Sequence, residues 1–196
     1  MLENSALENL ENSENSSLEN SENSSLKNSA PGVYKLDGIF APWRSKYFGK
    51  KPDTCVFCDI AQNPSKDDEN FVLFRAKYCF CVMNRYPYTL GEFMIIPYFH
   101  TDNIENLQSE IWLEMCGIAQ IGVGILKSEL GAKGVNLGMN LGAVAGAGIA
   151  EHVHLHLVPR WERDTNFITT IGGARVHGVP FLEQYEKLKS AFKDFA

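Results

Sequence analysis

Three histidines alternate with apolar residues in the segment EHVHLHLVPR, which covers residues 151–160. Because successive side chains of a β-strand point to opposite faces, His152, His154 and His156 are expected to share one face, while the apolar residues between them anchor the strand in a core. An imidazole is a nucleophile near neutral pH, so it can attack a phosphorus atom and later leave. The pattern therefore predicts a nucleophilic site in which neighbouring imidazoles hold phosphate oxygens or assist a leaving group.

A metal site is the alternative explanation for clustered histidines. A rise of about 3.3 Å per residue places the Cα atoms of His152 and His156 about 13 Å apart, so a straight strand does not easily direct all three imidazoles to one ion. Two of them could share an ion if other ligands came from elsewhere in the chain. The preceding segment, NLGAVAGAG at residues 140–148, favours phosphate chemistry, because its small residues would let backbone N–H groups approach a phosphate closely.

Cys55 and Cys58 have the Cys-x-x-Cys spacing of metal ligands, but they supply only half of a four-ligand structural zinc site. A redox pair is a second interpretation, although no βαβ pattern surrounds it, and two buried cysteines are a third. Cys79, Cys81 and Cys116 fit core positions. The total of five cysteines is odd and no secretory signal is visible, so the sequence predicts a reducing cytoplasm and no disulfide framework.

The elements that must position these residues are short strands and two helices. Apolar and aromatic runs predict strands over residues 71–75, 78–83, 92–96, 135–141 and 152–158. A long helix is expected from an N-cap at Ser109 to a glycine cap near Gly131. A C-terminal helix would carry Phe181, Tyr185, Leu188, Phe192 and Phe195 at helical spacing. This order predicts an α+β fold, with an antiparallel sheet of about five strands packed against the helices.

The first thirty residues differ from the rest of the chain. The motif LENSENSS repeats there, and one leucine in every eight residues cannot build a packed face, so residues 1–30 are predicted to be a disordered low-complexity tail and residues 31–196 the folded domain. Six glutamates and one lysine lie in the tail, whereas the domain nearly balances 18 acidic against 17 basic residues. A nearly neutral domain argues against binding a nucleic-acid polymer. No apolar run approaches the roughly 20 residues needed to span a bilayer, so no membrane partner is expected.

Residues 152–158 match the motif His-φ-His-φ-His-φ-φ, where φ is apolar, and with it the chain resembles the histidine-triad (HIT) family. Further segments that resemble the bacterial diadenosine tetraphosphate phosphorylase or hydrolase branch are FAPWRSKYF, CVFC, MNRYPYTLGEFMIIPYFH, NLGAVAGAG and VPRWERDTNF, over residues 40–170. The resemblance implies a HIT-like fold and a hydrolase that cleaves dinucleoside polyphosphates through a nucleotidyl-histidine intermediate. A phosphorylase or nucleotidyltransferase that uses phosphate as acceptor, a non-catalytic nucleotide-binding module and a histidine-based metalloenzyme are the alternatives.

The resemblance also implies roles for individual residues. His154 would be the nucleophile, with His156 at the phosphate or leaving group and His152 completing the triad. Asn84 would bind ribose. The residues expected at phosphate are Asn140, Gly146 and Gly148, and Trp161 would either stack on a base or serve as a packing residue.

Zinc-bearing relatives pair two such cysteines with two histidines, which implies a structural zinc site made by Cys55, Cys58, His100 and His152. A homodimer is expected from the resemblance and from the frequency of dimers among enzymes. Two positions depart from the family pattern. Ile149 stands where many relatives have Ser or Thr near phosphate, and Gly91-Glu92 stands where many have Gly-His.

Overall fold

The structure is a computed structural model that describes residues 54–164, 171 and 179–195. The predicted tail at 1–30, the domain boundary at 31 and the aromatic segment at 40–48 lie outside these residues, so those predictions stay untested.

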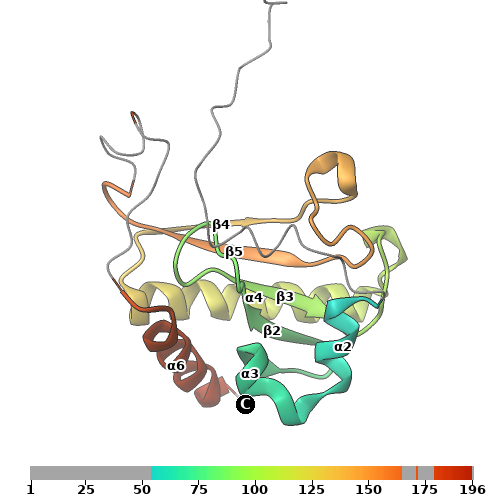
Figure 1. The fold of residues 1–196 in the computed structure, drawn as a ribbon, viewed down its shortest axis with the longest axis horizontal. Coiled ribbons are helices and arrows are strands. Elements are labelled where there is room, and N and C mark those ends of the chain that lie inside the picture. Colours follow the sequence, from blue (N-terminus) through green and yellow to red (C-terminus); the bar gives the residue numbers. More distant parts are fainter. Residues whose placement is uncertain (1–53, 165–170, 172–178, 196) are drawn as a thin grey trace, which may run out of the picture. The chain divides into compact units, whose positions relative to one another are not determined.

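The described part is built on one five-stranded sheet in which every paired strand is antiparallel (Figure 1). The strand order is β1-β2-β3-β5-β4. The strands are β1 (Val72–Arg75), β2 (Cys79–Met83), β3 (Phe93–Pro97), β4 (Gly134–Gly138) and β5 (Leu155–Arg160). The predicted α+β fold and its five-stranded antiparallel sheet are confirmed.

Helices α4 (Ser109–Leu130) and α6 (Phe181–Phe192) are the two long helices that the sequence predicts. The predicted N-cap is wrong by one residue, because Gln108 is the cap and Ser109 is the first helical residue. Gly131 ends α4 in the left-handed region, with φ 64°, as a glycine cap does. Phe195 lies beyond α6 in a 3₁₀ turn and is exposed, so it is not part of the buried helix face.

Two short helices precede the sheet, α2 (Val56–Gln62) and α3 (Asp67–Asn70). Helices of seven and four residues carry too few turns to show a helical period, which is why the sequence pattern did not reveal them. Helix α2 begins directly after Cys55 and contains Cys58, so it decides where both thiols lie.

The sheet buries a different hydrophobic cluster on each face, and strand alternation assigns its side chains. Along β2, Cys79, Cys81 and Met83 pack with α4 and α6, whereas Phe80 and Val82 pack with Phe57 and Ile60 of α2. On β5, Leu155 and Leu157 belong to the α4 face. Since His156 is the cross-strand partner of Met94, which packs on the α2 face, the histidines lie on the α2 side.

The strand predicted over residues 152–158 begins at Leu155, so that prediction is wrong at its start. Partner strand β3 ends at Pro97, which has no N–H to donate to a ladder. The Pro97 carbonyl lies 2.9 Å from Nε2 of His152. The chain before Leu155 is held by the N–H of Val153, which donates to the carbonyl of Thr101 at 2.8 Å.

Helix α4 is long and apolar enough, by length and composition, to cross a membrane, and it is the one such helix in the described ranges. This helix differs from the expectation that no segment is suited to span a bilayer. Core helices of soluble proteins meet the same criterion, and α4 buries Met115, Ile118 and Leu126 in the core against the sheet. The expectation of no membrane partner stays a prediction.

Candidate active site

The three histidines of the motif lie on one side of the sheet, and two of them contact Phe57 of α2. The Phe57 ring centroid is 5.6 Å from that of His152 and 5.1 Å from that of His154. The rings of His154 and His156 are 4.8 Å apart. The common face that the alternation predicts is therefore present, although only His156 lies within β5 itself.

His154, the predicted nucleophile, is held by its own backbone neighbour. Its Nδ1 lies 2.9 Å from the carbonyl oxygen of His152. Because a carbonyl only accepts hydrogen bonds, Nδ1 carries the proton and Nε2 keeps a lone pair. The residue is 6% exposed, and burial lowers the pKa of His154, so the neutral form persists at lower pH than for a free histidine. This arrangement provides a neutral imidazole with one nitrogen available to attack.

His156 is fixed by a carboxylate instead of a carbonyl. Its Nδ1 lies 2.9 Å from Oε1 of Glu92, which is completely buried at the start of β3. The same oxygen accepts a hydrogen bond from Nδ2 of Asn84 at 2.9 Å, and Oε2 accepts one from the N–H of Tyr88 at 2.6 Å. Asn84 also accepts a hydrogen bond at Oδ1 from the N–H of Tyr86 at 2.9 Å. The structure thus brings Asn84 and His156 together through Glu92, a residue that the sequence analysis had noted only as a departure from the family.

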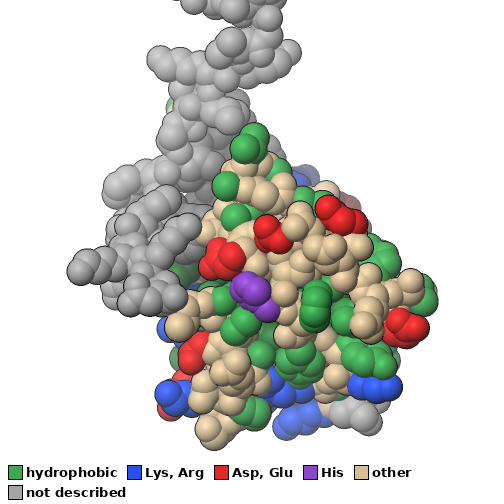
Figure 2. Space-filling view, turned by 90° about the vertical axis from the view of Figure 1, so that its right-hand side faces the viewer, with side chains coloured by type: hydrophobic (Ala, Val, Ile, Leu, Met, Phe, Trp, Pro, Cys, Tyr) green, Lys and Arg blue, Asp and Glu red, His purple; other side chains and the backbone are tan. Residues whose placement is uncertain are grey.

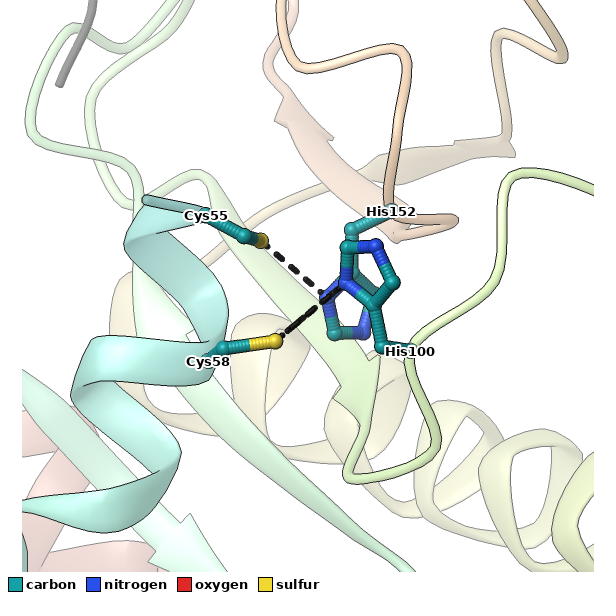
Figure 3. Close-up of side chains that lie close together, drawn as sticks. All are labelled: Cys55, Cys58, His100 and His152. Carbon is teal, nitrogen blue, oxygen red and sulfur yellow. Dashed lines mark hydrogen bonds between the residues drawn. The ribbon is translucent and has the colours of Figure 1, made fainter. Parts of the chain in front are cut away.

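The four predicted metal ligands converge at the other end of the histidine motif (Figure 3). Helix α2 presents Cys55 and Cys58, the segment after β3 presents His100, and the segment before β5 presents His152. Their ligand atoms all lie within 4.8 Å of one another. The structure therefore shows a cluster that could hold a metal ion.

Several distances within the cluster are close to those between the ligands of a tetrahedral ion. Nδ1 of His152 lies 3.4 Å from Sγ of Cys55 and 3.3 Å from Nδ1 of His100, and Sγ of Cys58 lies 3.2 Å from Nδ1 of His100. Zinc bonds of about 2.0 to 2.3 Å would place tetrahedral ligand atoms about 3.3 to 3.8 Å apart. His152 also presents the correct nitrogen, since Nε2 donates to the Pro97 carbonyl and leaves Nδ1 unprotonated.

Burial favours the neutral forms of two of the four residues, His152 and Cys58. Burial lowers the pKa of His152 to about 4. Burial, followed by the hydrogen bond and charge of Cys55, raises the pKa of Cys58 to about 11. A bound cation would reverse the trend for the thiol, because a coordinating thiol is deprotonated. Figure 2 shows histidine side chains reaching the surface close to acidic ones, and His100 is the exposed member of the cluster.

The predicted phosphate loop is exposed and contains two glycines with positive φ. Gly142 has φ 82° and Gly146 has φ 94°, which side chains with a Cβ rarely adopt. Gly146 and Gly148 are exposed, and Asn140 is half-buried. The ends of this loop and residues 102–105 line an open cavity of about 580 Å³. No imidazole is among its lining residues, so the cavity does not by itself define the reactive centre.

Trp161 lies at the end of β5, against the core rather than beside the histidines. Its Nε1–H donates to the carbonyl of Leu130 at 2.9 Å, and its ring packs on the cluster of the α4 face. This position is that of the packing residue considered as one alternative. The base-stacking role stays a prediction.

Known protein families and sequences include several that match this chain. The HIT domain family model matches residues 65–163. A protein of Mycobacterium tuberculosis named AP-4-A phosphorylase is 35% identical over 152 residues, which cover 72% of this chain and 77% of that protein. A protein of Arabidopsis thaliana named adenylylsulfatase HINT3 is 32% identical over 110 residues, which cover 56% of this chain and 54% of that protein.

A solved structure shares the fold. The crystal structure of a Zn-bound histidine triad family protein from Mycobacterium smegmatis matches with a TM-score of 0.59 and 26% identity, and the match covers 72% of this chain and 95% of that one. The antiparallel sheet with its helices is therefore the HIT-like fold. This chain belongs to the HIT family, as the sequence resemblance predicts.

Proposed function

We propose that this protein cleaves dinucleoside polyphosphates by transferring a nucleotidyl group to Nε2 of His154. The observation that carries the proposal is the buried His154 imidazole, whose Nδ1 lies 2.9 Å from a carbonyl oxygen, so that Nε2 is the nitrogen left for attack. In the first step a bond forms between Nε2 and the α-phosphorus, and the bond from that phosphorus to the leaving polyphosphate oxygen breaks. Asn84 and the loop residues Asn140, Gly146 and Gly148 are proposed to bind the ribose and the phosphates.

Two acceptors fit the second step. Attack by water would release AMP, and attack by inorganic phosphate would release ADP, with the phosphorus–nitrogen bond breaking in both cases. The name of the 35% identical relative from M. tuberculosis favours phosphate as acceptor. The proposal that this chain is a phosphorylase rather than a hydrolase rests on that likeness, because both reactions share the step at His154.

The test is an incubation of the purified protein with diadenosine tetraphosphate, with and without inorganic phosphate, followed by separation of the products. ATP and ADP that appear only with phosphate are the expected result. ATP and AMP without phosphate would identify the hydrolase instead. Turnover that survives in the His154→Asn variant would contradict the covalent mechanism.

We also propose that the metal held by Cys55, Cys58, His100 and His152 is zinc with a structural role. Two thiolates and two imidazoles fill a tetrahedral site and leave no position open for substrate. Metal analysis of protein purified without added metal should give about one zinc per chain. Cytoplasmic location and a homodimer are further proposals, and light scattering of the purified protein tests the second.

A further inference from the structure

Glu92 is a fully buried carboxylate whose hydrogen-bond partners belong to the candidate site. It precedes β3, a strand of five buried residues, at a position where an apolar side chain would pack well. A carboxylate in such a place is costly unless donors surround it. Three N–H groups do so, from Asn84, Tyr88 and His156.

The backbone of Glu92 closes the turn that carries Asn84. The N–H of Asn84 donates to the carbonyl of Glu92 at 3.0 Å, and the N–H of Glu92 donates to the carbonyl of Thr89 at 3.0 Å. The side chain of Glu92 also binds this turn, through the N–H of Tyr88 and Nδ2 of Asn84. In addition it joins the turn to His156 on the neighbouring strand.

The single oxygen Oε1 makes this connection. It accepts hydrogen bonds from Nδ2 of Asn84 and from Nδ1 of His156, each at 2.9 Å. Since a carboxylate oxygen accepts, Nδ1 of His156 carries a proton and its Nε2 points away from Glu92. When Nε2 is protonated as well, the two side chains form an ion pair at this distance.

We propose that Glu92 is a positioning residue that holds His156 as the proton donor to the leaving group and fixes it relative to Asn84. This inference rests on the proposed function. As Nε2 of His154 bonds to the α-phosphorus, the phosphorus–oxygen bond to the leaving group breaks and that oxygen takes the proton from Nε2 of His156. His156 is then neutral, with Nδ1–H still donated to Glu92.

The deciding variant is Glu92→Gln, which keeps the shape and removes the charge. Two AMP esters serve as probes, because p-nitrophenolate leaves readily as an anion whereas phenolate needs a proton more. We expect kcat on the phenyl ester to fall about 100-fold, the usual size of a general-acid contribution, and kcat on the p-nitrophenyl ester to fall less than about 5-fold, with KM little changed on both. Equal losses on the two esters would overturn the proposal, because a general structural defect slows both.

A double-mutant cycle on diadenosine tetraphosphate gives a second answer. If Glu92 acts through His156, Glu92→Gln should cost little in a protein that already carries His156→Ala. Full additivity would contradict the coupling. Glu114→Gln is the matched control, because that half-buried carboxylate also accepts a backbone N–H at 2.6 Å, from Tyr78, on the opposite face of the sheet. It should leave the ratio between the two esters unchanged.

A measurement on the native protein does not depend on the variant folding. Imidazole ¹⁵N NMR of the unsubstituted protein should show His156 protonated at Nδ1, and Glu92→Gln should weaken that preference. A neutral His156 with its proton on Nε2 would overturn the assignment even if no ester is cleaved. Native protein that turns over no nucleotide, yet shows the Nδ1 proton, would contradict the proposed function and leave the Glu92–His156 arrangement standing.

Discussion

At the two ends of the histidine motif, the imidazole nitrogens have different partners. At one end His152 lies among two thiols and a second imidazole, with Nδ1 free to coordinate and Nε2 bonded to a carbonyl. At the other end His156 gives Nδ1 to a buried carboxylate. Between them His154 donates its Nδ1–H to a carbonyl, which leaves Nε2 for the attack that we propose. The partner of the first nitrogen decides what the second nitrogen can do.

This difference matches the roles that we propose, a structural metal ligand at His152 and reactive imidazoles at His154 and His156. Burial lowers the pKa of His152 to about 4, which suits a neutral ligand. Nδ1 of His156 lies 2.9 Å from the buried carboxylate of Glu92, a distance at which the two side chains form an ion pair when the imidazole is protonated. Substitutions at His156 should therefore change kcat, whereas substitutions of the metal ligands should change thermal stability.

The largest expected effect comes from the centre of the motif. His154→Asn removes the nucleophile, so kcat on diadenosine tetraphosphate should fall by about 10⁴-fold or more, while His156→Asn should cost about 10²-fold. Steady-state kinetics measures both, and thermal unfolding should show both variants folded. A loss at His156 as large as that at His154 would break the distinction between nucleophile and proton donor.

Metal removal tests the structural role that we propose for the metal at the His152 end of the motif. A structural ion bound at a thousandfold excess over its Kd contributes about 4 kcal/mol to stability, so chelation should lower the unfolding midpoint by several degrees or more. Cys58→Ser should reproduce this drop without a chelator. Activity that disappears at once on chelation while the protein stays folded would show that the metal takes part in the reaction.

Phe57 links the metal cluster to the centre of the motif, because its ring contacts both His152 and His154. Phe57→Leu keeps most of the volume, and we expect a loss of stability of about 1 kcal/mol. We also expect a moderate fall in kcat, since His154 loses the ring that packs against it. Ile60→Val, on the same helix and in the same hydrophobic cluster, is the control. Equal effects of the two substitutions on kcat would show that α2 acts only through general packing.

The smallest effect is expected outside the motif, at Trp161. Trp161→Phe removes the hydrogen bond to the Leu130 carbonyl and should cost about 1 kcal/mol of stability, measured by denaturant unfolding. KM should be unchanged if the ring is a packing residue. A severalfold rise in KM would support the base-stacking alternative and extend the substrate site beyond His156.

Much of this arrangement could be predicted from the sequence, because alternation and spacing are local properties. The common face of the histidines, the five strands and the long helix follow from periodicity. The metal cluster does not, since Cys55 and Cys58 alone left three interpretations open, and His100 was assigned to them only by resemblance. The contacts of Glu92 were the hardest to predict from the sequence. A charged residue before an apolar strand looks like a solvated end, and only the structure shows that its partners come from a turn and another strand.

The enclosure of His154 has a consequence for the stereochemistry of the reaction. With Nδ1 bonded to a carbonyl and Phe57 against the ring, the edge that carries Nε2 is the one available to substrate. The leaving group and the later acceptor must then occupy the same side of the phosphorus in turn, opposite the imidazole. Each in-line displacement inverts the phosphorus, so two of them restore its original handedness. An isotopically chiral phosphorothioate substrate should therefore yield a product of retained configuration.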